Sequence, residues 1–170
     1  MKSILAIVLA SILLGLLCAC GISGTASKRP EGPVLSYTYS YSGMRAFPIR
    51  QYEVERDSLG QLQLRFSQDG PDITLYRIPE ETLDRIGEIV LQNKLYKLKE
   101  HYRPTLEILD GYGWHVHIGY ESSSISSGGS NAWPSASLSG GIEAINSLLD
   151  SLIQSASPDD IIGHESYLNR

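Results

Sequence analysis

Two histidines, His115 and His117, are the residues of this chain whose type and spacing best fit metal chemistry. On a strand, residues two apart project from the same face, so the pair can supply two ligands to zinc or copper. Further ligands could come from Glu121 on the same face, and from His101 or Asp110. The alternative is that both imidazoles only decorate the polar face of a strand, because a catalytic zinc normally takes three protein ligands. We expect this second arrangement, with no bound metal or other cofactor.

Other catalytic patterns are missing from the sequence. The serines of residues 122–130 form no G-x-S-x-G elbow, and the folded body contains no S-x-x-K motif. His164-Glu165 lacks the second histidine of a zincin motif. Gly128-Gly129 leads into a loop that ends at a proline, and not into the helix that a phosphate-binding loop requires. The sequence therefore favours a protein that is not an enzyme.

The element that positions the histidines is an expected strand beginning at Gly113. Apolar side chains alternate with polar or small ones along it, which is the period of a strand with one buried face. The apolar set is Trp114, Val116, Ile118 and Tyr120, and the other set is His115, His117, Gly119 and Glu121. A serine-rich turn follows, a short return strand begins at Ile125, and residues 128–134 are expected to form a loop tipped by Trp133.

This hairpin and loop hold the candidate binding surface. Aromatic anchors beside adaptable polar groups are common in recognition surfaces, and the two tryptophans of the chain both lie here. The candidate residues are Trp114, His115, His117, Asn131 and Trp133. Two alternatives remain open: Trp133 folds inward as a plug over the core, or the 126–134 loop inhibits a partner enzyme.

The rest of the body predicts an α+β fold. Strands are expected over residues 34–42, 49–56, 62–66 and 73–78, with short turns between them, which is typical of an antiparallel meander. Because residues 49–56 carry charges on both faces, we expect that strand to be bulged or at an edge. Helices are expected from Pro79 to about Lys94, and from Ser137 or Ser139 to residue 156. The prediction is one domain, residues 34–157: an antiparallel sheet of about six strands with two helices packed on one face. Residues 158–170 are expected to be a loosely ordered tail.

Composition and charge limit the class of partner. Beyond residue 20, the chain of 170 residues carries 13 basic against 19 acidic residues, a formal charge of −6. Such a domain repels phosphate backbones, so we expect no nucleic-acid partner. Ten tyrosines against two phenylalanines are consistent with half-exposed sheet faces or with a recognition surface.

Residues 1–20 have the layout of a signal peptide, with Lys2, an apolar run and then small residues. Both cysteines of the chain, Cys18 and Cys20, lie at its end, so the body can form no internal disulfide. The segment Leu17-Cys18-Ala19-Cys20 resembles the lipobox of bacterial lipoproteins, with the small Ala19 before Cys20. That resemblance implies a signal peptide of residues 1–19, cleavage before Cys20, and lipidation of Cys20 with acyl chains that hold it at a membrane. Residues 20–33 would then form the lipidated cysteine and a flexible tether.

The central hairpin carries a second resemblance. Its pattern W-x-h-x-I-x-Y, a serine-glycine turn and N-x-x-P resembles uncharacterised bacterial lipoproteins, which implies a shared fold and no particular activity. The leading interpretation is an exported, lipid-anchored protein of the cell membrane or outer membrane. It would bind a small ligand or another envelope protein, or steady an envelope assembly. The alternatives are a metal-dependent hydrolase centred on His115 and His117, and a secreted enzyme inhibitor.

Overall fold

The computed structural model describes residues 28–43, 49–106 and 111–167. The expected signal peptide, the lipidation site Cys20 and the candidate metal ligand Asp110 lie outside these residues. Within the described ranges, no helix is both long and apolar enough to cross a membrane.

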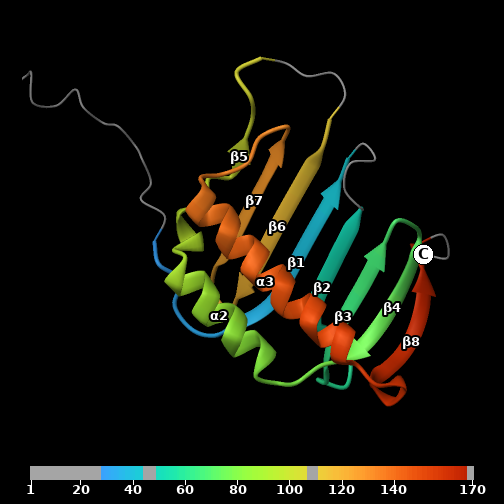
Figure 1. The fold of residues 1–170 in the computed structure, drawn as a ribbon. Helices are drawn as coiled ribbons and strands as arrows, with labels where there is room; N and C mark the ends of the chain where they lie inside the picture. The colour runs from blue at the N-terminus through green and yellow to red at the C-terminus, as the bar shows by residue number, and fades with distance from the viewer. Residues whose placement is uncertain (1–27, 44–48, 107–110, 168–170) are drawn as a thin grey trace, which may run out of the picture.

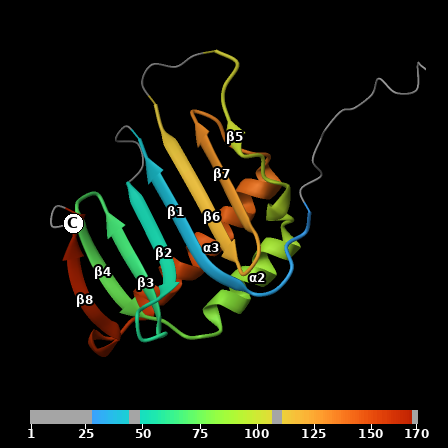
Figure 2. The same ribbon diagram turned by 180° about the vertical axis from the view of Figure 1, so that it is seen from behind.

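The body is built on an eight-stranded sheet in the order β5-β7-β6-β1-β2-β3-β4-β8 (Figures 1 and 2). Its strands are β1 Val34–Ser42, β2 Arg50–Arg56, β3 Leu62–Gln68, β4 Asp72–Arg77, β5 His101–Tyr102, β6 Gly113–Tyr120, β7 Ser124–Ser130 and β8 Ile161–Ser166. All neighbouring strands pair antiparallel except β5 and β7, which are parallel. The meander β1–β4 is confirmed, and β6 joins it by pairing with β1.

The α+β class is confirmed, and the expected number of strands was too low. The sequence did not predict the two-residue β5 or the strand β8, and it placed β8 inside a loosely ordered tail. In the structure β8 pairs with β4 from Asp72↔Ser166 to Tyr76↔Ile161. Ile161 and Ile162 both remain exposed, so this edge strand has no alternating apolar pattern to reveal it. Backbone pairing to β4, which a local pattern does not record, forms the strand.

The expectation that residues 49–56 form an edge or a bulged strand was wrong. β2 lies inside the sheet between β1 and β3, with an unbroken register on both sides. Tyr52 and Val54 are buried in the core, while Glu53 faces the other way and forms an ion pair with Arg65 of β3. The charges that indicated an edge are therefore accommodated by a cross-strand partner on the polar face.

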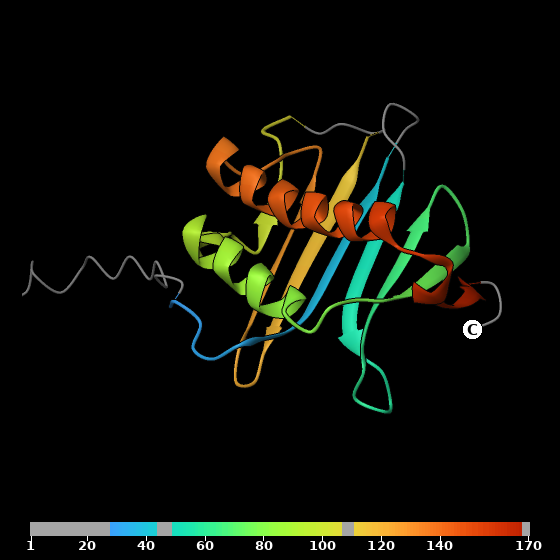
Figure 3. The ribbon, with the colours of Figure 1, turned by 60° about the horizontal axis from the view of Figure 1, so that its bottom comes forward.

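Two α-helices, α2 Thr82–Gln92 and α3 Ala136–Ser155, cover one face of the sheet (Figure 3). Short 3-10 turns, η2 Leu95–Lys97 and η3 Pro158–Asp160, follow them. α2 begins at Thr82, after the expected start at Pro79, whose carbonyl accepts a hydrogen bond from Thr82 N at 3.0 Å. Close packing of α3 depends on Gly141, because a Cβ at this position would collide with Asn93 and Leu95. The opposite face of the sheet is called the helix-free face below.

Tyrosines form much of the core between the sheet and the helices. Tyr37 and Tyr52 are fully buried, and their hydroxyl groups donate to α3: Tyr37 to Asn146 Oδ1 and Tyr52 to Asp150 Oδ1, each at 2.7 Å. Phenylalanine would leave both acceptors without these partners. Tyr37 and Tyr52 therefore bring apolar rings into the core, and their hydroxyl groups fix α3 to the sheet.

Candidate functional site

The alternating pattern of β6 is confirmed, and it divides the candidate binding surface between two faces. Trp114 faces the helices and is 4% exposed, whereas His115 is exposed on the helix-free face. His117 lies on that face as well, because it is two residues from His115 on the same strand. His115 Nε2 lies 3.2 Å from Ser126 Oγ, and burial together with His117 lowers the pKa of His115. The histidines and Trp133 therefore cannot form one continuous contact surface.

Among the described residues, the possible additional metal ligands do not lie beside the histidines. Within residues 28–43, 49–106 and 111–167, no group of three His, Cys, Asp or Glu side chains is arranged to hold a metal ion. His101 belongs to β5, which β7 separates from β6, and its Nε2 lies 3.5 Å from Glu100. Glu121 lies in the exposed turn after β6. Among the described residues, His115 and His117 are therefore the two ligands that this site could offer to a metal ion.

The expected loop of residues 128–134 is shorter than the sequence indicated, because β7 continues to Ser130. Gly128 and Gly129 pair with His115 and Trp114 of β6, so they are strand residues and not exposed loop donors. Glycine is required at 129, where a Cβ would collide with the Trp114 indole. The absence of a side chain at Gly129 leaves room for the Trp114 indole over β7.

Trp133 both covers the core and presents a surface to solvent. Its ring stacks on Trp114, with centroids 5.1 Å apart and planes at 2°. It is nevertheless 39% exposed. The loop is held by hydrogen bonds from Trp114 Nε1 to Ala132 O at 2.7 Å and from Tyr112 N to Asn131 Oδ1 at 2.9 Å. Asn131 also adopts a positive φ of 53°, so it serves to shape the loop.

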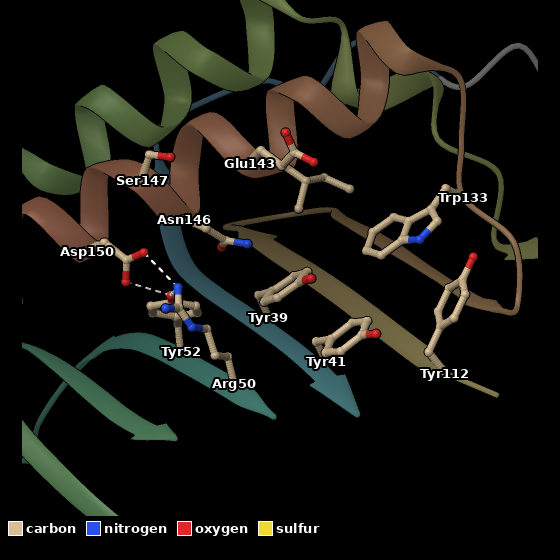
Figure 4. A pocket seen from close by; sticks show the side chains of 11 residues that line it. Tyr39, Tyr41, Arg50, Tyr52, Tyr112, Trp133, Glu143, Asn146, Ser147 and Asp150 are labelled. Atoms are coloured by element: carbon tan, nitrogen blue, oxygen red, sulfur yellow. Dashed lines mark hydrogen bonds and ion pairs between the residues drawn. The ribbon is translucent and has the colours of Figure 1, made fainter. Parts of the chain in front are cut away.

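Beside Trp133 the structure contains an open cavity of about 610 Å³ between α3 and the sheet, called the aromatic cleft below (Figure 4). It lies where β1 ends and β6 begins. Its lining residues are Tyr39, Tyr41, Arg50, Tyr52, Tyr112, Trp133, Ile142, Glu143, Asn146, Ser147 and Asp150. Ligand sites in proteins are commonly concave, of roughly 300–1,000 Å³, with aromatic walls and a few convergent polar groups.

The aromatic cleft has an aromatic side and a polar side (Figure 4). The rings come from Tyr41 at the end of β1, from Tyr112 just before β6, and from Trp133 in the 131–134 loop. Their centroids lie 5.8–6.3 Å apart, with interplanar angles from 11° to 25°. Polar side chains come from α3: Glu143, Asn146, Ser147 and Asp150. Their spacing of three, four and seven residues places them on one face of the helix.

No family model and no curated protein matches this chain. The chemistry of the cleft therefore has to be read from its own side chains.

An ion pair forms one end of the aromatic cleft. Arg50 Nη1 lies 2.8 Å from Asp150 Oδ2 and also donates to Tyr52 Oη at 3.1 Å. The Arg50 and Asp150 side chains are 36% and 28% exposed, so water and ligands can reach both. Burial, followed by the bond to Asp150, raises the pKa of Tyr52 well above its ordinary value. Tyr52 therefore remains a neutral donor to Asp150.

Tyr39 lies deeper in the same cleft. Burial, followed by the neighbouring Tyr41, raises its pKa from 10.0 to about 12. Its hydroxyl is thus protonated throughout the physiological range, and it can both donate and accept a hydrogen bond.

Sequence reasoning found Trp133 and missed most of the aromatic cleft. One signal was present: Tyr37, Tyr39 and Tyr41 share a face of β1, and polar residues recur on one side of α3. Neither pattern says that these two faces meet. Only the packing of α3 across the sheet brings Tyr41 and Glu143 to the same cavity.

Proposed function

We propose that this protein is an exported, lipid-anchored envelope protein whose domain binds a ligand in the aromatic cleft. The observation that carries the proposal is the cleft itself: an open cavity in which aromatic rings face convergent polar groups of α3. Concave sites of this size, with aromatic walls and a few polar groups, are where proteins commonly bind small ligands.

The position of the tether supports binding in the anchored state. β1 follows the tether directly, and its first residue, Val34, pairs with Tyr120 at one end of the sheet. Tyr41, in the cleft, pairs with Trp114 near the other end. A strand rises by about 3.3 Å per residue, so roughly 25 Å separates the tether from the cleft. A lipid attached to Cys20 would therefore leave the cleft open to solutes of the envelope.

Blocking the cleft tests the binding function. Ligand-observed NMR of the full chain with a chemically mixed fragment library should detect compounds that bind the wild type. Ser147→Phe places a large ring at an exposed position of the cleft, and these compounds should lose binding to it. Ala144→Phe is the matched control, since Ala144 is exposed on the same helix outside the cleft. Compounds that bind all three proteins equally would contradict the proposal.

Acyl labelling tests the anchor independently. Cells that express the wild type and are fed a labelled fatty acid should incorporate label into this protein, and Cys20→Ala should abolish the incorporation. Cys18→Ala is the control, because the residue before Cys18 is the bulky Leu17. Undiminished label in Cys20→Ala would exclude Cys20 as the lipidation site.

The other two interpretations receive less support from the described residues. For a hydrolase centred on His115 and His117, the part of the chain that the structure describes offers no third ligand beside the two imidazoles. An inhibitory loop of residues 126–134 is largely replaced by β7, which extends to Ser130.

A further inference from the structure

We infer that the aromatic cleft binds a neutral oligosaccharide, with one pyranose ring lying against Trp133. This inference rests on the proposed binding function and names its ligand class. It follows from the orientation of the rings, the kinds of polar group opposite them, and the charge.

The orientation of the rings favours a flat ligand face over a point charge. Cation-binding aromatic cages surround an ammonium group with ring faces. Here Tyr41 and Tyr112 lie within 11° and 23° of the plane of Trp133, so the rings do not enclose a common point. Trp114 stacks on the Trp133 ring, the Tyr41 and Tyr112 rings lie 6.3 and 5.8 Å from it, and Trp133 still keeps 39% of its surface exposed. A pyranose ring has a face of C–H groups that can pack on such an indole.

The polar side of the cleft fits groups that both donate and accept. Glu143 and Asp150 can only accept hydrogen bonds when ionised, and Arg50 can only donate. Asn146 Oδ1 is occupied by the Tyr37 hydroxyl, at 2.7 Å, which leaves the amide nitrogen as a donor. Sugar hydroxyl groups can bond both to acceptors and to donors, whereas a purely aromatic ligand would desolvate the Glu143 carboxylate and the Asn146 amide without offering them a hydrogen bond.

The charge of the cleft argues against anionic sugars. Arg50 is compensated by Asp150 at 2.8 Å, and Glu143 adds an exposed carboxylate at the rim. The chain beyond residue 20 is also acidic overall. A phosphate, sulfate or uronate group would therefore be repelled, and a neutral glycan would not.

Trisaccharide titration of the full chain tests the inference. The protein is purified in a detergent without a sugar headgroup and titrated with cellotriose, maltotriose and triacetylchitotriose. The two tryptophans of the chain lie stacked at the cleft, so binding should change their fluorescence saturably. At least one trisaccharide should bind with a Kd of about 1 mM or tighter, and calorimetry should give the same value.

Variants assign the binding to the cleft. Trp133→Ala should weaken the binding measured by calorimetry by about tenfold or more, and Trp133→Phe, which keeps a flat ring, by less. Glu143→Gln, at an exposed position, should alter affinity without loss of folding. His115→Ala, on the helix-free face, should leave affinity unchanged.

Three results would overturn the inference. The first is the absence of saturation by every trisaccharide up to ~10 mM. The second is equal affinity of wild type and Trp133→Ala. The third is saturable binding of choline or indole in the cleft when no trisaccharide binds, which would replace the ligand class and leave the binding function standing.

Discussion

The indole of Trp133 lies on the indole of Trp114, with ring centroids 5.1 Å apart and planes at 2°. Trp114 belongs to the core and Trp133 to the surface of the aromatic cleft, so the pair connects the two. Trp133 is thus supported by a buried residue of β6 and not by its own loop alone.

The two tryptophans should differ sharply in their effect on stability. Trp114→Ala removes a buried side chain and its bond to Ala132 O, and should lower the free energy of unfolding by about 3–5 kcal/mol. Trp133→Ala removes a half-exposed stacked ring and should cost about 0.5–1.5 kcal/mol. Urea denaturation monitored by circular dichroism measures both. Equal losses would mean that Trp133 is a core residue.

Neighbouring glycines in α3 should respond in opposite directions to alanine. Gly140→Ala adds a Cβ that meets nothing within 4 Å, so it should stabilise the protein by about 0.5–1 kcal/mol through helix propensity. Gly141→Ala forces a Cβ into Asn93 and Leu95, and should destabilise the protein despite the same propensity gain. Thermal melts of both variants measure the effect. A stabilised Gly141→Ala would contradict the close packing of α3.

Tyr39 should make stability fall at alkaline pH. Its pKa is raised from 10.0 to about 12 in the folded state, because burial disfavours the phenolate. The stability that protonated Tyr39 contributes to the folded state is complete below pH 10 and is lost as the pH rises toward 12. The reason is that, in this range, the tyrosine of the unfolded chain releases its proton while the folded one still holds it. Between these values Tyr39→Phe should lose less stability than the wild type, by on the order of 2 kcal/mol. Urea midpoints of both proteins at pH 8, 10 and 11.5 provide the comparison. If the midpoints of the wild type and of Tyr39→Phe fall in parallel with pH, the pKa of Tyr39 is not raised.

Arg65 joins two carboxylates on the helix-free face. Its side chain is 7% exposed and lies 3.0 Å from Glu53 Oε2 and 2.8 Å from Glu165 Oε2. Either Glu53→Gln or Glu165→Gln leaves one carboxylate in contact with the guanidinium, whereas the double variant removes both of the carboxylates that form its ion pairs. The double variant should therefore lose more free energy of unfolding than the two single variants together, by about 1 kcal/mol or more.

An exposed pair provides the comparison for Arg65. Arg56 and Glu80 lie 2.7 Å apart but are 46% and 63% exposed, so Glu80→Gln should change the urea midpoint little. Additive effects of the Glu53 and Glu165 substitutions would show that Arg65 does not couple β2 to β8.

The helix-free face shows how far local pattern can guide prediction. Alternation along β6 predicted correctly that His115 would lie opposite Trp114, because successive side chains of a strand must point to opposite faces. The same rule separates Trp114 from His115 and His117, and the stacking of Trp133 on Trp114, which alternation does not encode, places Trp133 away from the histidines as well. Gly128 and Gly129 belong to β7 and not to the expected loop, and glycine is required at 129 because a Cβ there would collide with the Trp114 indole and with Ala132 O.

What the sequence by itself determined is local: the α+β class, the β1–β4 meander, the β6–β7 hairpin and the apolar stripes of two helices. These follow from periodicity and turn chemistry, which neighbouring residues encode. Tertiary structure alone decided the pairing of β1 with β6, the edge strand β8 and the aromatic cleft. The cleft joins groups far apart in the chain, such as Tyr52 and Asp150, which are separated by 98 positions. Such meetings depend on how α3 crosses the sheet, and no local spacing records that crossing.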